Sequence, residues 1–249
     1  MLLLSPALRL FVRGIVLSVL FMFGMKHSLC QAKDTVTPEP WAAKLEVFKS
    51  PSLKESDFTP LFDGKALSGW VGAKKAYRVE HGAIVCQKGT AGNLFTEKEY
   101  SNFVLRFEFQ LSPGANNGLG IRSPLKGDPA YVGIELQILD NAAEKFAGLQ
   151  PYQYHGSAYG IAAAKRGALK PVGEWNQQEV MLVGDRLIVT LNKRKILDVN
   201  LKKVAPEGKT IDGREHPGLK RTKGHLGFLG HGDEVKFRKI RIVDLGESK

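Results

Sequence analysis

The feature that most constrains the fold of this chain is a succession of short apolar segments separated by turn residues, with little helical periodicity. Residues 103–112, FVLRFEFQLS, show the pattern clearly. Their apolar phase is Leu105, Phe107, Phe109 and Leu111, and their polar phase is Arg106, Glu108 and Gln110. A period of two is typical of a strand with one buried face. Many such strands without alternating helices predict an all-β protein, a sandwich of two antiparallel sheets.

The other predicted strands extend almost to the C-terminus. They are residues 76–87 (two strands joined at His81-Gly82), 118–122, 131–141, 178–201 (a meander turning at Gly184-Asp185 and Asn192-Lys193), 224–231 and 235–245. Gly, Asn and Asp at these turns favour the tight connections of antiparallel hairpins. Residues 141–149 could form one or two helical turns.

The N-terminus has the organisation of a secretory signal peptide. Arg9 and Arg13 precede a short apolar core at 14–25, and small residues follow. This pattern predicts cleavage after Cys30 or Ala32 and export to a periplasmic or extracellular location. A retained membrane anchor is the alternative, although the apolar run is short for a span. Lipidation of Cys30 is disfavoured by the residues that precede it.

The expected mature chain consists of a short arm and one domain. Residues 1–32 form the signal peptide, 33–57 a polar N-terminal arm or linker, and 58–245 the folded sandwich. Removal of the signal peptide after Ala32 leaves Cys86 without a partner, so no disulfide is expected. The apolar neighbours of Cys86 favour a small core residue over a nucleophile.

The charge of the chain bears on its partners. It carries 36 basic and 25 acidic residues, a formal charge of +11. Residues 1–32 hold three of the basic residues and none of the acidic ones, so the expected mature charge is +8. The mild basic cluster at 214–223 could bind nucleic acid or acidic glycans. Because no nucleic-acid-binding module is recognisable, we prefer a solvated basic face and expect no nucleic-acid partner.

Polar side chains alternate with apolar ones on three successive predicted strands. They are Arg106, Glu108 and Gln110 on the first strand, Arg122 on the second, and Glu135 and Gln137 on the third. On one concave sheet, such carboxylates, amides and guanidinium groups would line a groove for a hydroxyl-rich ligand. The alternative is a solvated outer sheet whose cross-strand ion pairs contribute little. Spacing alone favours neither.

Two histidines and one aspartate add further candidates. His225 and His231 share one phase of the strand at 224–231, and His231 precedes a Gly-Asp turn, where its side chain could overhang a groove. Glu135, Asp140 and His231 could together hold a divalent cation, although their separation in the sequence makes this a weak signal. No other cofactor is indicated, and serine-hydrolase, P-loop, zinc-protease and dinucleotide-binding motifs are absent from the sequence.

Six motifs occur in the order of one family of exported bacterial proteins. They are LFDGKALSGW (61–70), NNGLGIRS (116–123), GIELQILDN (133–141), AYG (158–160), GEWNQQEV (173–180) and GHLGFLGHGDEVKFRKIRI (224–242). From about Phe58 to Leu245 the chain resembles the 3-keto-disaccharide hydrolase domain family. The resemblance implies a concanavalin A-like jelly roll with a concave, sugar-accommodating sheet. It also implies substrates that are glycosides oxidised to a ketone at C3 of one sugar.

The chemistry of such a substrate suggests a route to its cleavage. The ketone acidifies the C2 proton, whose removal gives an enolate; the C1 substituent then leaves and water adds back, for a net hydrolysis. We assign Glu135 as the base, Arg122 as the stabiliser of the enolate and His231 as the acid. Substrate hydroxyls would be oriented by Gln137, Asn117, Asp140, Glu108 and Arg106. Asp140 lies in the apolar phase of its strand, so it could instead cap the following turn.

The chain departs from related patterns in three places. At 116–118 it reads Asn-Asn-Gly where the family usually has Asn-Ser-Gly, and at 229–231 Leu-Gly-His where the family usually has Gln-Asp-His. The spacing Glu135-x-Gln137-x-x-Asp140 also resembles the Glu-x-Asp-x-x-Glu strand of laminarinase-type glucanases. Because the middle acid is an amide here and the last is an aspartate, the double displacement of those retaining enzymes is disfavoured.

Two non-catalytic functions are alternative hypotheses to the enzyme. A glycan-binding module would use the same groove without acid–base groups, and an interaction domain would decorate cell-surface complexes. Carbohydrate is the partner expected of the enzyme and of the glycan-binding module. Trp70 and Trp175 could stack on sugar rings, but their positions favour packing in the core or at its rim.

We predict that the exported protein is cleaved between residues 28 and 33, because basic residues, a short apolar core and small residues follow one another there. The mass of the mature protein and of its N-terminal peptide checks this. An intact Met1 in a membrane fraction would contradict it and favour the anchor.

Overall fold

The computed structural model describes residues 53–205 and 210–246. The predicted signal peptide, 1–32, and the predicted arm up to residue 52 lie outside the described residues. In the part of the chain that is described, no helix is long and apolar enough to cross a membrane.

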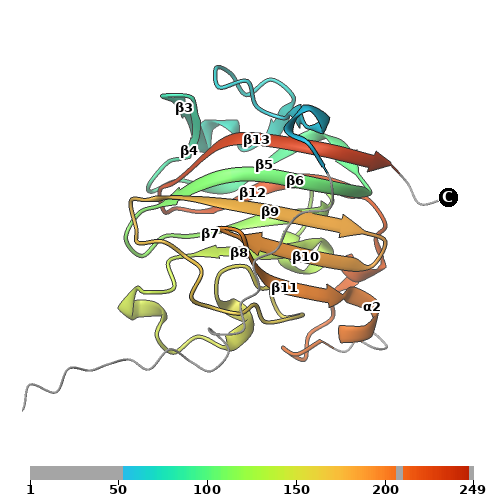
Figure 1. The fold of residues 1–249 in the computed structure, drawn as a ribbon. Coiled ribbons are helices and arrows are strands. Elements are labelled where there is room, and N and C mark those ends of the chain that lie inside the picture. Colours follow the sequence, from blue (N-terminus) through green and yellow to red (C-terminus); the bar gives the residue numbers. More distant parts are fainter. Residues whose placement is uncertain (1–52, 206–209, 247–249) are drawn as a thin grey trace, which may run out of the picture. The chain divides into compact units, whose positions relative to one another are not determined.

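The described strands form two antiparallel sheets, so the predicted sandwich is confirmed (Figure 1). The larger sheet contains, in order, β11 (Arg194–Asn200), β10 (Arg186–Leu191), β9 (Trp175–Val183), β6 (Asn102–Leu111), β13 (Val235–Gly246), β4 (Ala83–Cys86) and β3 (Tyr77–Glu80), with β1 (Thr59–Pro60) also beside β13. The smaller sheet contains β2 (Trp70–Gly72), β5 (Ala91–Tyr100), β12 (Gly224–His231), β7 (Asn116–Ser123) and β8 (Ile134–Leu139).

Helical structure is confined to short turns within the described residues. The α-helical turns are α1 (Pro129–Val132) and α2 (Leu201–Val204), and the 3₁₀ turns are η2 (Glu55–Asp57), η3 (Lys74–Ala76), η4 (Glu144–Phe146), η5 (Pro151–Gln153) and η7 (Pro217–Lys220). The strand predicted at 131–141 therefore begins only at Ile134. Asp128 and Pro129 explain the difference: the Asp128 side chain accepts the backbone N–H of Ala130 as an N-cap, and proline favours the first helical position.

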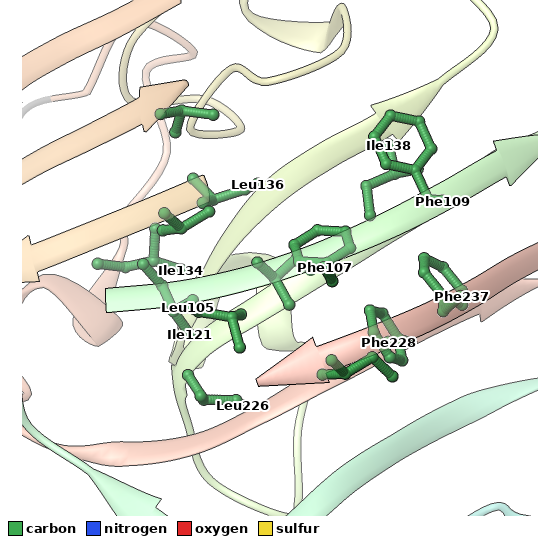
Figure 2. Packing of buried hydrophobic residues seen from close by; sticks show 14 of the residues in the cluster. Leu105, Phe107, Phe109, Ile121, Ile134, Leu136, Ile138, Leu226, Phe228 and Phe237 are labelled. Carbon is green, nitrogen blue, oxygen red and sulfur yellow. The ribbon is translucent and has the colours of Figure 1, made fainter. Parts of the chain in front are cut away.

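The core lies between the apolar faces of the two sheets (Figure 2). Phe228 of β12 stacks on Phe237 of β13 with ring centroids 3.7 Å apart, and it meets the edge of Phe107 of β6 at 5.8 Å. All three side chains are fully buried. Burial of each such aromatic side chain contributes on the order of 1.5–3 kcal/mol, so these contacts between sheets hold the sandwich together. Trp70 joins this core, stacked on Phe228 at 5.7 Å, as its predicted packing role requires.

The hairpin turns fall at the predicted positions. His81 and Gly82 link β3 to β4, and Asn192 and Lys193 link β10 to β11, all with positive φ. Two consecutive left-handed residues are typical of the tight turn that matches the twist of a hairpin. The strand β5 was not predicted, because Leu94, Phe95 and Thr96 are consecutive buried residues and show no alternation.

The prediction that three successive polar phases share one sheet is wrong. Arg106, Glu108 and Gln110 lie on β6 in the larger sheet, whereas Arg122, Glu135 and Gln137 lie on β7 and β8 in the smaller one. The chain crosses between the sheets in the turn at 112–115, where the Ala115 N–H donates to the Ser112 carbonyl at 3.0 Å. Because both outer faces of a sandwich are polar, alternation cannot tell which sheet a strand joins.

The outer polar face of β6 instead forms ion pairs across the larger sheet. Arg106 Nε donates to the Glu179 carboxylate at 2.6 Å, and Glu108 accepts from Arg238 at 2.7 Å and Lys239 at 2.8 Å. These are the cross-strand ion pairs of the alternative hypothesis, although Glu108 itself is buried at 6% exposure.

A buried histidine links the two sheets. His155 Nδ1 accepts the Leu139 N–H at 3.4 Å, so Nε2 carries the proton and donates to Gln178 Oε1 at 2.9 Å. The His155 ring also stacks on Phe109 at 5.0 Å. Full burial lowers its pKa to about 4, so the ring stays neutral in the folded protein at ordinary pH.

We predict that this histidine makes the fold acid-sensitive. Between pH 6.5 and about 4, the unfolded chain binds a proton at His155 that the folded chain does not. The free energy of unfolding therefore falls as pH is lowered through this range, by on the order of 3 kcal/mol in total. Urea denaturation between pH 7.5 and 4 measures the loss, which should shrink in His155→Gln.

The matched control is His81→Gln, because the His81 side chain is 93% exposed. It should keep the pH dependence of the natural protein. If His155→Gln and the natural protein lost stability equally on acidification, the assignment to His155 would be wrong.

Candidate functional site

A cavity of about 270 Å³ opens on the outer face of the smaller sheet. Its floor is formed by Glu135, Gln137 and Leu139, which alternate outward from β8, and by Asn116 of the neighbouring strand β7. His231, the last residue of β12, lines it as well. The inward phase of β8 is Ile134, Leu136 and Ile138, all without exposed surface, so core packing fixes the direction in which Glu135 and Gln137 point (Figure 2).

Loops supply the walls of the cavity. Tyr131 comes from α1, Phe146 and Tyr159 from the long connection between β8 and β9, and Arg214 from the segment before η7. That connection follows β8 closely, since the Tyr159 N–H donates to the Glu135 carbonyl at 2.9 Å. Long loops packed against a rigid sheet are common carriers of function.

A glycine makes room for the Glu135 carboxylate. Gly118 lies on β7 opposite Gln137, and a Cβ atom placed there would overlap Glu135 Oε1. The Glu135 side chain therefore leans across the bare backbone of Gly118 toward His231. A side chain at position 118 would close this part of the floor.

Three side-chain oxygens of the floor are buried without hydrogen-bond partners. They are Glu135 Oε1, Gln137 Oε1 and Asn116 Oδ1. Each unsatisfied buried acceptor costs about 1–3 kcal/mol. Acceptors gathered in one cavity fit a ligand that brings its own donors, and the hydroxyls of a sugar are such donors.

His231 and Glu135 form the charged pair of the cavity. His231 Nε2 lies 3.8 Å from Glu135 Oε1, and the histidine side chain is 49% exposed against 6% for the glutamate. The Glu135 carboxylate raises the pKa of His231 above its ordinary value, against the opposing effect of burial. The pair thus combines a buried carboxylate with an accessible imidazole that favours protonation.

Arg214 is the arginine that lines this cavity. Its guanidinium lies over the Tyr131 ring, 3.8 Å from the centroid, and also donates to the Tyr131 hydroxyl. Two residues on, buried His216 pairs with Asp212 at 3.0 Å, and Gly160 packs so closely on this pair that a Cβ would overlap it. Beyond its place in the basic cluster at 214–223, nothing in the sequence indicates a role for Arg214.

Arg122 does not line the cavity, which contradicts its predicted place in the groove. Its side chain is buried and donates to the carbonyl of Gly184 in the β9–β10 turn. The cause is an irregularity in the pairing of β7 with β12, where Arg122 adopts φ +50°. A bulge of this kind interrupts the alternation of side chains, so counting residues along the strand misplaces Arg122.

Asn117 and Asp140 also lie elsewhere than predicted. Asn117 shares the inward phase of β7, is fully buried and contacts Cys86, so its neighbour Asn116 takes the place in the cavity. Asp140 accepts the N–H groups of Gly114 at 2.8 Å and Ala142 at 3.1 Å. It caps the turn, which was the alternative left open by the sequence.

Arg106 and Glu108 line a separate cavity of about 360 Å³ on the larger sheet. The prediction that they lie beside Glu135 and His231 in one groove is therefore wrong. Trp175, at the start of β9, does not line this cavity and is covered by the guanidinium of Arg238 at 3.8 Å.

Metal binding gains no support from the carboxylates and histidines of the site. Among the described residues, no group of three or more His, Cys, Asp or Glu side chains could hold a metal ion. Glu135, Asp140 and His231 do not form such a group, because Asp140 is engaged in the turn.

Comparison with known proteins gives this arrangement a context. Residues 57–243 match the family model described as the 3-keto-alpha-glucoside-1,2-lyase-like domain. The chain belongs to this family. The match spans both sheets and includes every residue of the cavity.

Relatives of this 3-keto-alpha-glucoside-1,2-lyase-like domain include one curated protein and several solved structures. A protein of Bacteroides thetaiotaomicron named 3-keto-disaccharide hydrolase is 26% identical over 81% of this chain and 82% of its own. A Parabacteroides distasonis structure, described only provisionally as a glycosyl hydrolase, is 30% identical with a TM-score of 0.67, covering 76% of this chain and 99% of its own.

The jelly-roll fold expected of the family is confirmed by a more distant structure. A non-specific endo-β-1,3(4)-glucanase from family GH16 aligns with a TM-score of 0.50 at 13% identity, over 80% of this chain and 97% of its own. At this identity the likeness shows the fold alone.

We predict that Glu135 controls the titration of His231 in this 3-keto-alpha-glucoside-1,2-lyase-like domain. The carboxylate raises the His231 pKa, so Glu135→Gln should lower it toward the ordinary value of 6.5. Gly118→Ala should do the same, because its methyl group displaces the carboxylate. A histidine NMR titration measures both shifts, with the exposed Glu97→Gln as the control. An unchanged His231 titration in Glu135→Gln would show that the two groups do not interact.

Proposed function

We propose that this protein cleaves 3-keto-glycosides, with Glu135 as the base and His231 as the acid. The support is its family and the name of its curated relative, 3-keto-disaccharide hydrolase. The observation that carries the proposal is the Glu135 carboxylate itself. It is buried, its Oε1 has no hydrogen-bond partner, and His231 lies 3.8 Å away.

The Glu135 carboxylate removes the proton at C2 of the keto sugar. The electrons of the broken C–H bond form an enolate that includes the C3 ketone oxygen. These electrons then form the C1=C2 double bond, the bond from C1 to the glycosidic oxygen breaks, and that oxygen takes the proton of His231. Water next adds across the double bond, placing hydroxyl on C1 and returning the proton of Glu135 to C2. The second proton of the water restores His231, so one water is consumed in all.

The negative charge that develops on the ketone oxygen needs a positive group near it. Arg122 was the predicted candidate, but it is buried against the β9–β10 turn. Arg214 is the guanidinium at the cavity, positioned by its stacking on Tyr131. We assign Arg214 the role of enolate stabiliser, while Gln137 and Asn116 accept hydrogen bonds from the sugar hydroxyls. Export through the predicted signal peptide is part of the same proposal and places this chemistry outside the cytoplasm.

We predict that Glu135→Gln lowers turnover of a 3-keto-glucoside by roughly 10²–10⁴-fold, because the amide keeps the shape but cannot accept the proton. Binding of the keto sugar should persist. The melting temperature should hold or rise slightly, because a buried carboxylate without a full set of partners contributes little to folding. Turnover, affinity and melting temperature are measured on the same variant.

The matched control is Glu97→Gln, an exposed change on the same sheet that should leave all three quantities unaltered. Unchanged turnover in Glu135→Gln would remove it as the base. A protein that binds keto sugars but turns none over would be a glycan-binding module. In the active protein, turnover should fall as pH rises through the raised pKa of His231, because the acid is then deprotonated.

A further inference from the structure

The cavity changes from polar to apolar along β8. Its outward residues are Glu135, Gln137 and then Leu139, all of which line the cavity. Each residue of a strand advances about 3.3 Å, so the Cα atoms of Glu135 and Leu139 lie roughly 13 Å apart. This span is enough for two ring-sized groups placed end to end. At the Leu139 end, the loop residues Phe146 and Leu149 complete the lining.

The apolar end is held in place by its own hydrogen bonds. The buried Tyr154 donates its hydroxyl to the carbonyls of Phe146 at 3.0 Å and Ala147 at 3.1 Å. The Leu149 N–H donates to the Phe146 carbonyl at 3.3 Å. Leu139 is 1% exposed and closes the floor, whereas Phe146 and Leu149 are only partly buried, so the apolar surface at this end comes mainly from the loop. Their side chains and that of Leu139 offer no hydrogen-bonding group to a ligand.

Strand register places the acid on the apolar side of the base. Asn116 pairs with Leu139, and Gly230 pairs with Asn117. His231, one residue beyond Gly230, therefore lies level with Asn116 and Leu139. Glu135 pairs with Gly120, which is four residues farther along β7 than Asn116. In the proposed reaction His231 protonates the leaving oxygen. The leaving group then extends from His231 toward the apolar end.

We propose that the apolar end, formed by Leu139, Phe146 and Leu149, is the aglycone subsite and prefers an alkyl or aromatic aglycone to a second hydroxylated sugar. The inference rests on the proposed function for its orientation. Asn116, level with Leu139, offers a single acceptor at this end. Hydroxyls placed against Leu139, Phe146 and Leu149 would lose hydrogen bonds to water without replacement, whereas apolar groups gain from leaving water. The preference would set this chain apart from a relative named for a disaccharide.

An alkyl series tests the subsite without changing the leaving chemistry. The probes are the 3-keto derivatives of methyl and butyl glucoside with the same anomeric configuration. A fully buried methylene improves binding about fourfold, so three partly buried ones should raise kcat/KM about tenfold from methyl to butyl. Leu149→Ser and Phe146→Ser should each reduce this ratio to below about threefold.

The matched control is Leu245→Ser, because Leu245 is 46% exposed at the far end of β13 and does not line the cavity. It should keep the tenfold ratio. Melting temperatures confirm that all three variants are folded, and agreement between the two loop variants guards against a local rearrangement in either. Equal kcat/KM for the methyl and butyl substrates would overturn the subsite. The subsite would also be overturned if 3-keto-trehalose were cleaved faster than the butyl substrate and Leu149→Ser left its rate of cleavage unchanged.

Binding separates this inference from the proposed function. Unoxidised methyl and butyl glucosides are titrated into the natural protein and Leu149→Ser by NMR, which requires no turnover. If neither keto glucoside is cleaved but butyl glucoside binds more tightly and loses its advantage in Leu149→Ser, the subsite is supported and the proposed reaction is overturned. If the keto glucosides are cleaved but the two aglycones bind alike, the reaction is supported and the subsite is overturned.

Discussion

The pleat of β8 is the constraint on which the site depends. Ile134, Leu136 and Ile138 are fixed in the core between the sheets, so the alternate residues must point outward. Glu135 and Gln137 could not be moved from the cavity without removing the strand from the core. The floor of the site is therefore as rigid as the packing beneath it, whereas the walls come from loops that are held by their own local hydrogen bonds, such as those of Tyr154 to Phe146 and Ala147.

The same rigidity explains how the floor tolerates poor hydrogen bonding. Three acceptor oxygens of the cavity lie buried without hydrogen-bond partners, at a cost of about 1–3 kcal/mol each. A fold that depended on these groups would relax to pair them. This one is held instead by aromatic contacts between the sheets, such as Phe228 on Phe237. The inner face of the smaller sheet thus stabilises the fold, and its outer face carries the cavity. Binding of a sugar would supply the hydrogen bonds that the floor lacks.

The sequence predicts a site residue correctly where the side chains of its strand alternate regularly, and fails where they do not. Glu135 and Gln137 obey strict alternation on the regular strand β8, and His231 ends β12 beyond the irregularity of that strand; the structure brings all three to the cavity. Arg122 lies at a bulge and Asn117 in the opposite phase from Asn116, so position alone misplaced both. Arg106 and Glu108 alternate correctly but on the other sheet, which only the long-range pairing of strands decides. The wall residues come from irregular loops, where no periodicity exists to be read.

The identity of the acidic groups argues for elimination over direct displacement. Glycosidases of the two common mechanisms use a pair of carboxyl groups flanking the glycosidic bond. In this cavity Glu135 is the buried carboxylate, its second neighbour on the strand is the amide of Gln137, and Asp140 is engaged by backbone N–H groups. Asp128 also lines the cavity, but it is exposed and caps α1. One buried carboxylate beside one imidazole fits the proposed elimination, because a substrate whose C–H bond is already acidic needs a proton removed and a proton supplied but no second carboxylate.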